Sequence, residues 1–422
     1  MRILIANSYQ AIVGGIEKYL QVLIPSLLDR GHDIAMVYEF AAAGGQTTLD
    51  GQSPPVPRWY WEDLRNSPSL WKELAAWKPD VVYLQGAQSL DVERSFQNAY
   101  PTVLFAHVYH GTCATGRKCH AFPQQRPCQR TFSPMCLLLH YPRRCGGLNP
   151  LTAWRDYQFQ SGRKRLLQGY RSILVASTSM YREFEQHGIE RARLNLVPLP
   201  NTESDDSETF VHRRVPTGRI LFAGRLTELK GVDHLIRALP GAAKRLGKPL
   251  QLTILGDGAE RSKLEDLAQK IGVQAEFTGW LDAEAKLGVM SRSDLLAVPS
   301  LWPEPFGLVG IEAGRLGLPA VGYAVGGIPD WLIPGQTGEL APGDPPTIQG
   351  LENAIVRVFA NPVHYAQLCR GAREHAREFT IEQHLMKLEA ALQAACVGGS
   401  ALKAAVDLTV GNGVTKCTLL PL

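Results

Sequence analysis

The stretch RILFAGRLTELKG, residues 219–231, joins a short apolar run to a basic loop bounded by glycines. An amphipathic stretch with helical spacing, residues 232–245, follows it directly. A buried strand, a loop and a helix in this order predict one unit of a parallel sheet with helices on its faces. The same alternation recurs along most of the chain, so we expect an α/β protein.

The alternation runs in two series. We expect strands at 2–6, 34–37, 80–84, 102–106, 173–176 and 194–197, and then at 219–223, 250–255, 275–278, 295–298 and 320–322. Between them, residues 200–217 are polar and acidic without periodicity, which is typical of a linker. We therefore predict two Rossmann-like domains that face a central cleft, at 1–200 and 201–378. A helix at 379–396 is expected to pack back on the first domain, and 397–422 is a tail of unassigned role.

Composition excludes several classes of protein. The 422 residues are 45% hydrophobic and 20% charged with a net charge of +4, which is ordinary for a globular chain and excludes a disordered one. No apolar run approaches the ~18 residues of a membrane span, and the first residues lack the apolar run of a signal peptide. These features favour a cytoplasmic protein, and nothing in them indicates nucleic acid as a partner.

Two loops have residues suited to phosphate. Gly14 and Gly15 lie between the first expected strand and the first expected helix, where a phosphate can approach backbone N–H groups closely. Arg225 and Lys230 lie in the loop after the first strand of the second series and could clamp a diphosphate. The alternatives are a simple glycine turn for the first loop and a solvated basic loop for the second.

A pair of carboxylates forms a third candidate. Glu304 and Glu312 flank a loop and the start of an expected helix, and residues 306–308 (Phe306, Gly307 and Leu308) would supply N–H groups at its N-terminus. At ~100° per helical residue the two carboxylates need not share a face, so they can touch different parts of one ligand. A first-turn Glu that complements the helix dipole would explain one of them without a ligand.

As an ordered set, these motifs resemble a known family. GGIE at 14–17, GRLTELKG at 224–231, LGDG at 255–258, EPFGLVGIEA at 304–313 and VGGIPD at 325–330 are similar to family 4 of the retaining glycosyltransferases, which have the GT-B fold. The likeness covers roughly residues 1–395, is weak between about 40 and 80, and is absent from the tail.

The resemblance implies a role for each matched position. Gly15, with Gly14 beside it, would contact the donor diphosphate, and Arg225 and Lys230 would hold it. Glu312 would bind the nucleotide ribose, Glu304 would lie near the hydroxyls of the donor sugar, and the backbone of residues 306–308 would face sugar and phosphate. The family usually transfers without a metal, so no cofactor is expected beyond the nucleoside-diphosphate sugar itself, a UDP- or GDP-sugar.

His107 ends the expected strand 102–106 at a place where family members often carry a His near the donor sugar. Some have His-Asp-Tyr there and a Cys six positions after the His. Here the spacing to Cys113 matches, but Val108 replaces the Asp. His110 is a rival for the same role, and a structural His at a strand end is the alternative.

Residues 108–150 form a distinctive insert in the first domain. They contain Cys113, Cys119, Cys128, Cys136 and Cys145, without the C-x2-C pairs typical of zinc sites. Plain thiols are the leading interpretation, with a metal site or a regulatory disulfide as alternatives.

The insert is also strongly basic. No Asp or Glu occurs between Glu93 and Asp156, while eight Lys or Arg do. A solvated basic loop would explain this, and so would contact with an anionic acceptor or an anionic membrane at the inner face of the cell.

Together these features predict a glycosyltransferase of EC class 2.4. It would move a sugar with retention from a nucleoside-diphosphate sugar to an acceptor hydroxyl in glycan, polysaccharide or glycolipid synthesis. The alternatives are a nucleotide-sugar epimerase or hydrolase of the same fold, or a non-catalytic protein that binds sugar nucleotides. The acceptor could be a glycan, a lipid-linked molecule or a small molecule.

Overall fold

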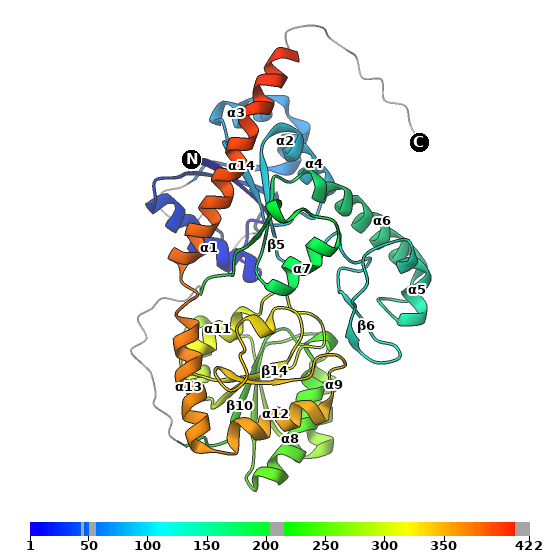
Figure 1. Ribbon diagram of the computed structural model, residues 1–422, viewed down its shortest axis with the longest axis vertical. Coiled ribbons are helices and arrows are strands. Elements are labelled where there is room, and N and C mark those ends of the chain that lie inside the picture. The colour runs from blue at the N-terminus through cyan, green and yellow to red at the C-terminus, as the bar shows by residue number, and fades with distance from the viewer. Residues whose placement is uncertain (44–45, 50–55, 202–214, 410–422) are drawn as a thin grey trace.

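The computed structural model describes residues 1–43, 46–49, 56–201 and 215–409. It contains two parallel sheets, one above the other in Figure 1, each with helices on its faces. We call the part with the seven-stranded sheet the N-terminal domain and the part with the six-stranded sheet the C-terminal domain. The predicted α/β architecture is confirmed.

The N-terminal sheet has the strand order β3-β2-β1-β4-β5-β8-β9. Its strands are β1 (Arg2–Tyr9), β2 (Asp33–Phe40), β3 (Arg58–Tyr60), β4 (Val81–Leu84), β5 (Thr102–Ala106), β8 (Ser172–Val175) and β9 (Leu194–Leu196). Its helices are α1 (Gly15–Asp29), α2 (Trp61–Asn66), α3 (Pro68–Trp77), α4 (Leu90–Ala99), α6 (Pro150–Leu166) and α7 (Thr178–Gln186). The central strands β4, β5 and β8 are buried along their whole length, as expected for a parallel sheet covered on both faces.

The C-terminal sheet repeats this order as β12-β11-β10-β13-β14-β15. Its strands are β10 (Arg219–Ala223), β11 (Gln251–Leu255), β12 (Gln274–Gly279), β13 (Leu295–Val298), β14 (Ala320–Tyr323) and β15 (Gly338–Ala341). Its helices are α8 (Val232–Leu246), α9 (Arg261–Ile271), α10 (Ala283–Arg292), α11 (Leu308–Arg315), α12 (Ile348–Phe359) and α13 (Pro362–Ala376). The strand β15 was not among the expected strands.

The insert forms a lobe at the side of the N-terminal domain (Figure 1). A two-stranded ladder, β6 (Cys119–His120) with β7 (Arg126–Pro127), is followed by α5 (Met135–Arg143), which packs on α6. The predicted linker falls largely on residues 202–214, outside the described residues, so the domain boundary at 200 stays a prediction.

The last helix, α14 (Ile381–Thr409), returns from the C-terminal domain to pack on β4, β5, β8 and α1 (Figure 1). It continues through the first part of the predicted tail, and residues 410–422 lie outside the described residues. The side chains of Leu385, Leu388, Leu392 and Ala395 are buried at helical spacing and face the N-terminal domain core.

A buried polar contact fixes this helix. His384 Nε2 lies 2.8 Å from Tyr19 Oη, and His384 Nδ1 lies 2.8 Å from the Pro198 carbonyl oxygen. Tyr19 Oη also lies 2.9 Å from Tyr83 Oη. Because burial disfavours the imidazolium, the pKa of His384 falls to about 4. In its neutral form, His384 therefore helps to hold α14 on the N-terminal domain.

The neutral histidine makes folding stability depend on pH. An unfolded His binds its proton near pH 6.5, whereas native His384 binds it near pH 4, so acidification in this window favours the unfolded chain. The contribution is present above pH 6.5 and is lost progressively as the pH falls towards 4. As the pH falls through this window, the free energy of unfolding of His384→Gln should decrease less steeply than that of the wild type. The difference in slope should be up to about 1.4 kcal/mol per pH unit. Urea denaturation at pH 7, 6 and 5 measures this slope.

Gln383→Ala is the matched control, because this exposed neighbour on the same helix does not titrate. It should keep the wild-type slope. Parallel slopes for His384→Gln and the wild type would contradict the role of His384.

Candidate functional site

The candidate site lies at the topological switch point of the C-terminal sheet, where successive strands stop being added on one side and begin to be added on the other. The neighbouring strands β10 and β13 are the two on either side of this switch point, and ligands of open α/β sheets bind outside the carboxyl ends of such strands. The loops that follow them, 224–231 and 299–307, are joined by a hydrogen bond of 2.8 Å from the Leu301 N–H to the Leu229 carbonyl. The two loops predicted to bind a ligand therefore form one surface.

Glycines allow a third loop to join this surface. The Gly224 N–H donates to the Leu255 carbonyl at 2.9 Å, which brings the loop after β11 against the loop after β10. Gly256 has φ +133°, and a Cβ there would lie 2.0 Å from the Gly224 carbonyl oxygen. Gly258 would meet the Leu226 carbonyl oxygen at 2.3 Å. The LGDG motif is thus required for the loops to pack.

Lys230 and Glu304 are in direct contact. Lys230 Nζ lies 2.6 Å from Glu304 Oε1, which also accepts hydrogen bonds from Ser300 Oγ at 2.6 Å and Trp302 Nε1 at 2.9 Å. Glu304 is only 6% exposed, and burial alone would raise its pKa. The Lys230 ammonium and the hydrogen bonds outweigh burial and hold the pKa below its usual range. The carboxylate is therefore charged at neutral pH.

Glu312 makes a separate contact. Its Oε2 lies 2.6 Å from Lys286 Nζ of α10, and both side chains are largely buried. The two carboxylates thus have different basic partners, and that they touch different parts of one ligand stays a prediction. No sequence motif pointed to Lys286, which lies 26 residues before Glu312 in the chain.

The residues of the segment 306–308 have different structural roles. The Phe306 ring is buried against Phe379, with ring centroids 5.7 Å apart, and its carbonyl accepts from Trp331 Nε1 at 2.7 Å. Gly307 has φ +93° and is the N-cap residue of α11, which begins at Leu308. The expected N–H groups at a helix N-terminus are present here, but the Phe306 side chain turns towards the domain junction.

The loop after β14 locks Glu304 in place from the other side. The Gly327 N–H donates to the Glu304 carbonyl at 2.6 Å. Gly326 has φ +57°, and a Cβ there would lie 2.2 Å from that carbonyl oxygen. A Cβ on Gly327 would meet Ser177 of the N-terminal domain at 2.7 Å. The VGGIPD motif therefore packs between Glu304 and the opposite domain.

The remaining predicted residues lie on the loop after β10 and at the start of α1. Arg225 lies exposed on the loop after β10. Gly14 is the N-cap residue of α1, and Gly15 has open space around the position of a Cβ. Glu17 of the same GGIE motif is buried and accepts a hydrogen bond from Asn7 Nδ2 at 3.1 Å.

His107 is held as a neutral ring. Its Nε2 donates to Gln85 Oε1 at 2.8 Å, and its ring stacks on Phe105 with centroids 4.6 Å apart. Burial, with a smaller effect of His384, lowers the pKa of His107 to about 3. The rival His110 contacts Arg163 through Nδ1, and its pKa is also about 3 because of burial. Neither ring is poised to exchange a proton near neutral pH.

A cavity of about 450 Å³ lies between the two domains, next to the loop that carries Glu304. Tyr109, Lys118 and Arg182 line it from the N-terminal domain, and Pro303 and Asp330 line it from the C-terminal domain. The insert thus forms part of its wall. The Tyr109 ring also meets the Trp302 ring edge to face at 6.3 Å, which links the two domains next to the buried carboxylate.

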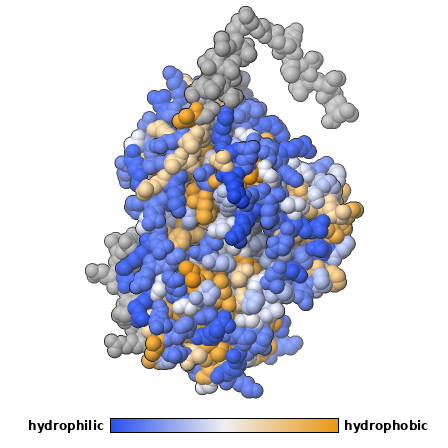
Figure 2. Space-filling model, viewed as in Figure 1, coloured by the Kyte–Doolittle hydropathy of each residue, from blue (hydrophilic) through white to orange (hydrophobic). Residues whose placement is uncertain are grey.

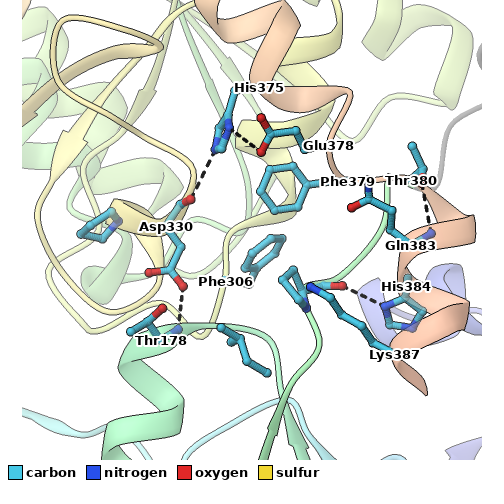
Figure 3. Close-up of a pocket in the computed structure, with 13 residues that line it drawn as sticks. Thr178, Phe306, Asp330, His375, Glu378, Phe379, Thr380, Gln383, His384 and Lys387 are labelled. Carbon is cyan, nitrogen blue, oxygen red and sulfur yellow. Dashed lines mark hydrogen bonds and ion pairs between the residues drawn. The ribbon is translucent and has the colours of Figure 1, made fainter. Parts of the chain in front are cut away.

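Figure 3 shows a second cavity, of about 460 Å³, where α13 and α14 pass the domain junction. Phe306 and Phe379 line it, and Asp330 Oδ2 accepts from the Thr178 N–H of the opposite domain at 2.6 Å. Asp330 lines both cavities and therefore lies between them.

The insert cysteines are free thiols in the structure, and within the described ranges no set of three or more His, Cys, Asp or Glu side chains is grouped to hold a metal. Burial raises the pKa of Cys119 to about 12 and of Cys145 to about 11, which keeps both protonated.

Comparison with known proteins agrees with this geometry. Residues 14–200 match the family described as "Glycosyl transferase 4-like domain", and residues 208–378 match "Glycosyl transferases group 1". A glycogen synthase of Mycobacterium tuberculosis is 38% identical over 170 residues, 39% of this chain and 40% of the relative. A D-inositol 3-phosphate glycosyltransferase of Saccharomonospora viridis is 36% identical over 172 residues, 38% of this chain and 39% of the relative. The chain thus spans about two fifths of the curated relatives it matches.

Solved structures share the fold at low identity. A structure of HepE from Anabaena in complex with UDP superposes with a TM-score of 0.67, 19% identity and coverage of 93% of this chain and 100% of that one. The lipopolysaccharide outer core galactosyltransferase WaaB in apo form superposes with a TM-score of 0.64 and 16% identity. The match covers 93% of this chain and 99% of that one. Two facing Rossmann-like domains with a switch-point site define a GT-B protein. The chain belongs to the family 4-type glycosyltransferases, with a 4-like domain followed by a group 1 domain.

The close approach of Gly326 to the Glu304 backbone makes a stability prediction. For Gly326→Ala we expect a loss of about 2–4 kcal/mol, because the positive φ disfavours alanine and the added carbon overlaps a carbonyl oxygen. Gly147→Ala is the control, since no atom lies within 4 Å of its Cβ position. Urea denaturation of both variants measures the difference, and equal stabilities would contradict the packing described.

Proposed function

We propose that this chain is a retaining glycosyltransferase that moves a sugar from a nucleoside-diphosphate sugar to an acceptor hydroxyl. The observation that carries the proposal is the buried, ionised Glu304 held by Lys230 at the switch point of the C-terminal sheet. A basic loop, a helix N-terminus and two separately held carboxylates lie on the elements that follow β10 and β13. These groups suit a ligand that carries a diphosphate and two sets of hydroxyls.

Cleavage of a sugar–phosphate bond builds negative charge on the diphosphate and positive charge on the sugar ring. Arg225 and Lys230 lie in the loop after β10, where they would take up the first charge together with the N-terminus of α11. Glu304 would orient the sugar hydroxyls beside the cavity between the domains. The acceptor hydroxyl would attack from that cavity, assisted by the departing phosphate.

The neutral His107 fits this scheme as a hydrogen-bonding group. A ring with a pKa of about 3 is not a base that gains and loses protons during turnover. Because the HepE structures include complexes with UDP and with UDP-glucose, UDP-sugars are the first donors to test, followed by GDP-sugars.

The basic loop predicts a loss of diphosphate affinity. For Arg225→Ala we expect UDP to bind about 10–100-fold more weakly, the size of one charge-assisted hydrogen bond, with folding unchanged because the side chain is exposed. Lys244→Ala, an exposed charge in the last turn of α8, is the matched control. Calorimetric titration with UDP, and with GDP if UDP does not bind, measures both. Unchanged affinity in Arg225→Ala would reject the assignment of this loop.

The carboxylates predict separable effects. For Glu304→Gln we expect turnover of the sugar donor to fall roughly a hundredfold while UDP affinity stays near the wild type, because UDP lacks the transferred sugar that Glu304 would orient. For Glu312→Gln we expect the main effect on UDP affinity and not on turnover. UDP should bind about tenfold or more weakly, because the ribose contact is lost.

Product analysis distinguishes the classes of activity. Transfer to an added acceptor supports the proposal, and the anomeric configuration of the product tests retention. Donor consumption at the same rate without acceptor indicates an epimerase or hydrolase and rejects transfer. Binding of UDP without consumption of any donor indicates a non-catalytic protein.

A further inference from the structure

The lobe formed by the insert has a surface that the proposed reaction does not use. Residues 94–155 contain no Asp or Glu, and they include the whole of β6, β7 and α5 with the start of α6. In Figure 1 this lobe stands out at the side of the N-terminal domain, away from both sheets. Its two sides differ in character.

The inner side is fixed to the protein body by specific polar contacts. Lys118 Nζ lies 2.5 Å from Glu183 Oε1 of α7, and both side chains are largely buried. The Phe132 N–H donates to His187 Nε2 at 2.8 Å. Arg126 lies 2.6 Å from Asp344 of the C-terminal domain. These contacts position the lobe, so its outer side chains are not needed to attach it.

The outer side is apolar to an unusual degree. Among the described residues, seven of the fifteen large hydrophobic side chains that are exposed lie between positions 122 and 154. They are Phe122, Met135, Leu138, Tyr141, Leu148, Leu151 and Trp154, and we call them the apolar outer face. Figure 2 shows hydrophobic side chains at the edge of the molecule where α5 and α6 lie. Scattered exposed apolar residues need no explanation, but a group of this kind marks a contact surface.

The spacing of these residues suits a single face. Met135, Leu138 and Tyr141 recur every three residues along α5, which places them within about 120° of one another around that helix. Helix α5 packs on α6, which carries Leu151 and Trp154 in its first turns. Leu138 and Leu151 are 71% and 73% exposed.

Exposed positive charge lies on the same lobe as the apolar outer face. Arg117, Arg130, Arg144 and Arg155 are exposed, and Arg144 lies over the Phe122 ring at 5.8 Å. The exposed carboxylate that follows this stretch is Asp156, beside Arg155. Glu183 and Asp344, the acidic groups that face the lobe from the body, are already paired with Lys118 and Arg126. The outer side therefore carries a net positive charge.

We propose that the apolar outer face and its arginines dock the protein on an anionic lipid bilayer. Exposed apolar and basic side chains on one lobe match the acyl boundary and the negative headgroups of such a surface. Within the described residues no helix is long and apolar enough to cross a membrane, so the contact would be peripheral. Lys118, Pro127, Cys128 and Gln129 of the same lobe line the cavity between the domains, so docking would hold that cavity beside the bilayer. If the proposed transfer is correct, a lipid-borne acceptor follows from this placement.

Vesicle sedimentation tests the docking without any catalytic readout, so its failure is distinct from failure of the proposed function. We expect the full chain to sediment with phosphatidylcholine vesicles that contain about 30 mol% phosphatidylglycerol, to stay in the supernatant with phosphatidylcholine alone, and to dissociate as salt rises. For Arg130→Gln/Arg155→Gln we expect partitioning about 25-fold weaker, at about fivefold per charge. Lys244→Gln/Lys270→Gln, two exposed charges on α8 and α9, is the matched control and should bind as the wild type does.

A second pair of variants distinguishes a membrane from a soluble polyanion. Leu138→Ser/Leu151→Ser should lose vesicle binding but keep any affinity for dextran sulfate, because it removes apolar surface and no charge. Val363→Ser/Met386→Ser, at positions 68% and 64% exposed outside the lobe, is its control. Unchanged vesicle binding by the leucine variant would overturn the proposal in favour of a site for soluble anions. Equal binding to neutral vesicles, or occupation of the face by a second copy in sedimentation equilibrium, would overturn it as well.

Discussion

A charged carboxylate buried at the switch point of the C-terminal sheet is the constraint on which the site depends. Glu304 is 6% exposed, and such a charge is stable only with a counter-ion and hydrogen bonds. Lys230 reaches it from the loop after β10, and Ser300 and Trp302 reach it from its own loop. The ion pair therefore ties together two loops from either side of the switch point. Removal of either partner would leave the other without compensation.

The glycines around this ion pair follow from the same constraint. Four loops of the C-terminal sheet, those after β10, β11, β13 and β14, approach one another at backbone distance around Glu304. At Gly256, Gly258 and Gly326 a side chain would overlap a carbonyl oxygen of the neighbouring loop. These positions also have φ values that favour glycine. Motifs that read as ligand-binding signatures in the sequence are thus partly packing requirements of the loops themselves.

The two domains are joined at more than one place. The neutral His384 docks the last helix on the N-terminal domain, while Asp330 receives the Thr178 N–H and Arg126 meets Asp344 across the cleft. Contacts of this kind fix how the domains face one another around the cavity of about 450 Å³. The Arg126 contact comes from the insert, so this lobe takes part both in the cavity wall and in the surface that we assign to the membrane.

Periodicity and loop chemistry in the sequence were enough to predict most strands and the two-domain α/β architecture, because these follow from local patterns repeated at each strand end. The contact between Lys230 and Glu304 was not predicted. The pairing of Glu312 with Lys286, and the neutral state of His107, could not be predicted, since each depends on burial and on partners distant in the chain. The turn of Phe306 towards the domain junction has the same origin. The sequence by itself determined which residues stand at the carboxyl ends of the strands. Only the tertiary structure decided which of them meet, which are charged and which face solvent, because distance and desolvation are properties of the packed chain.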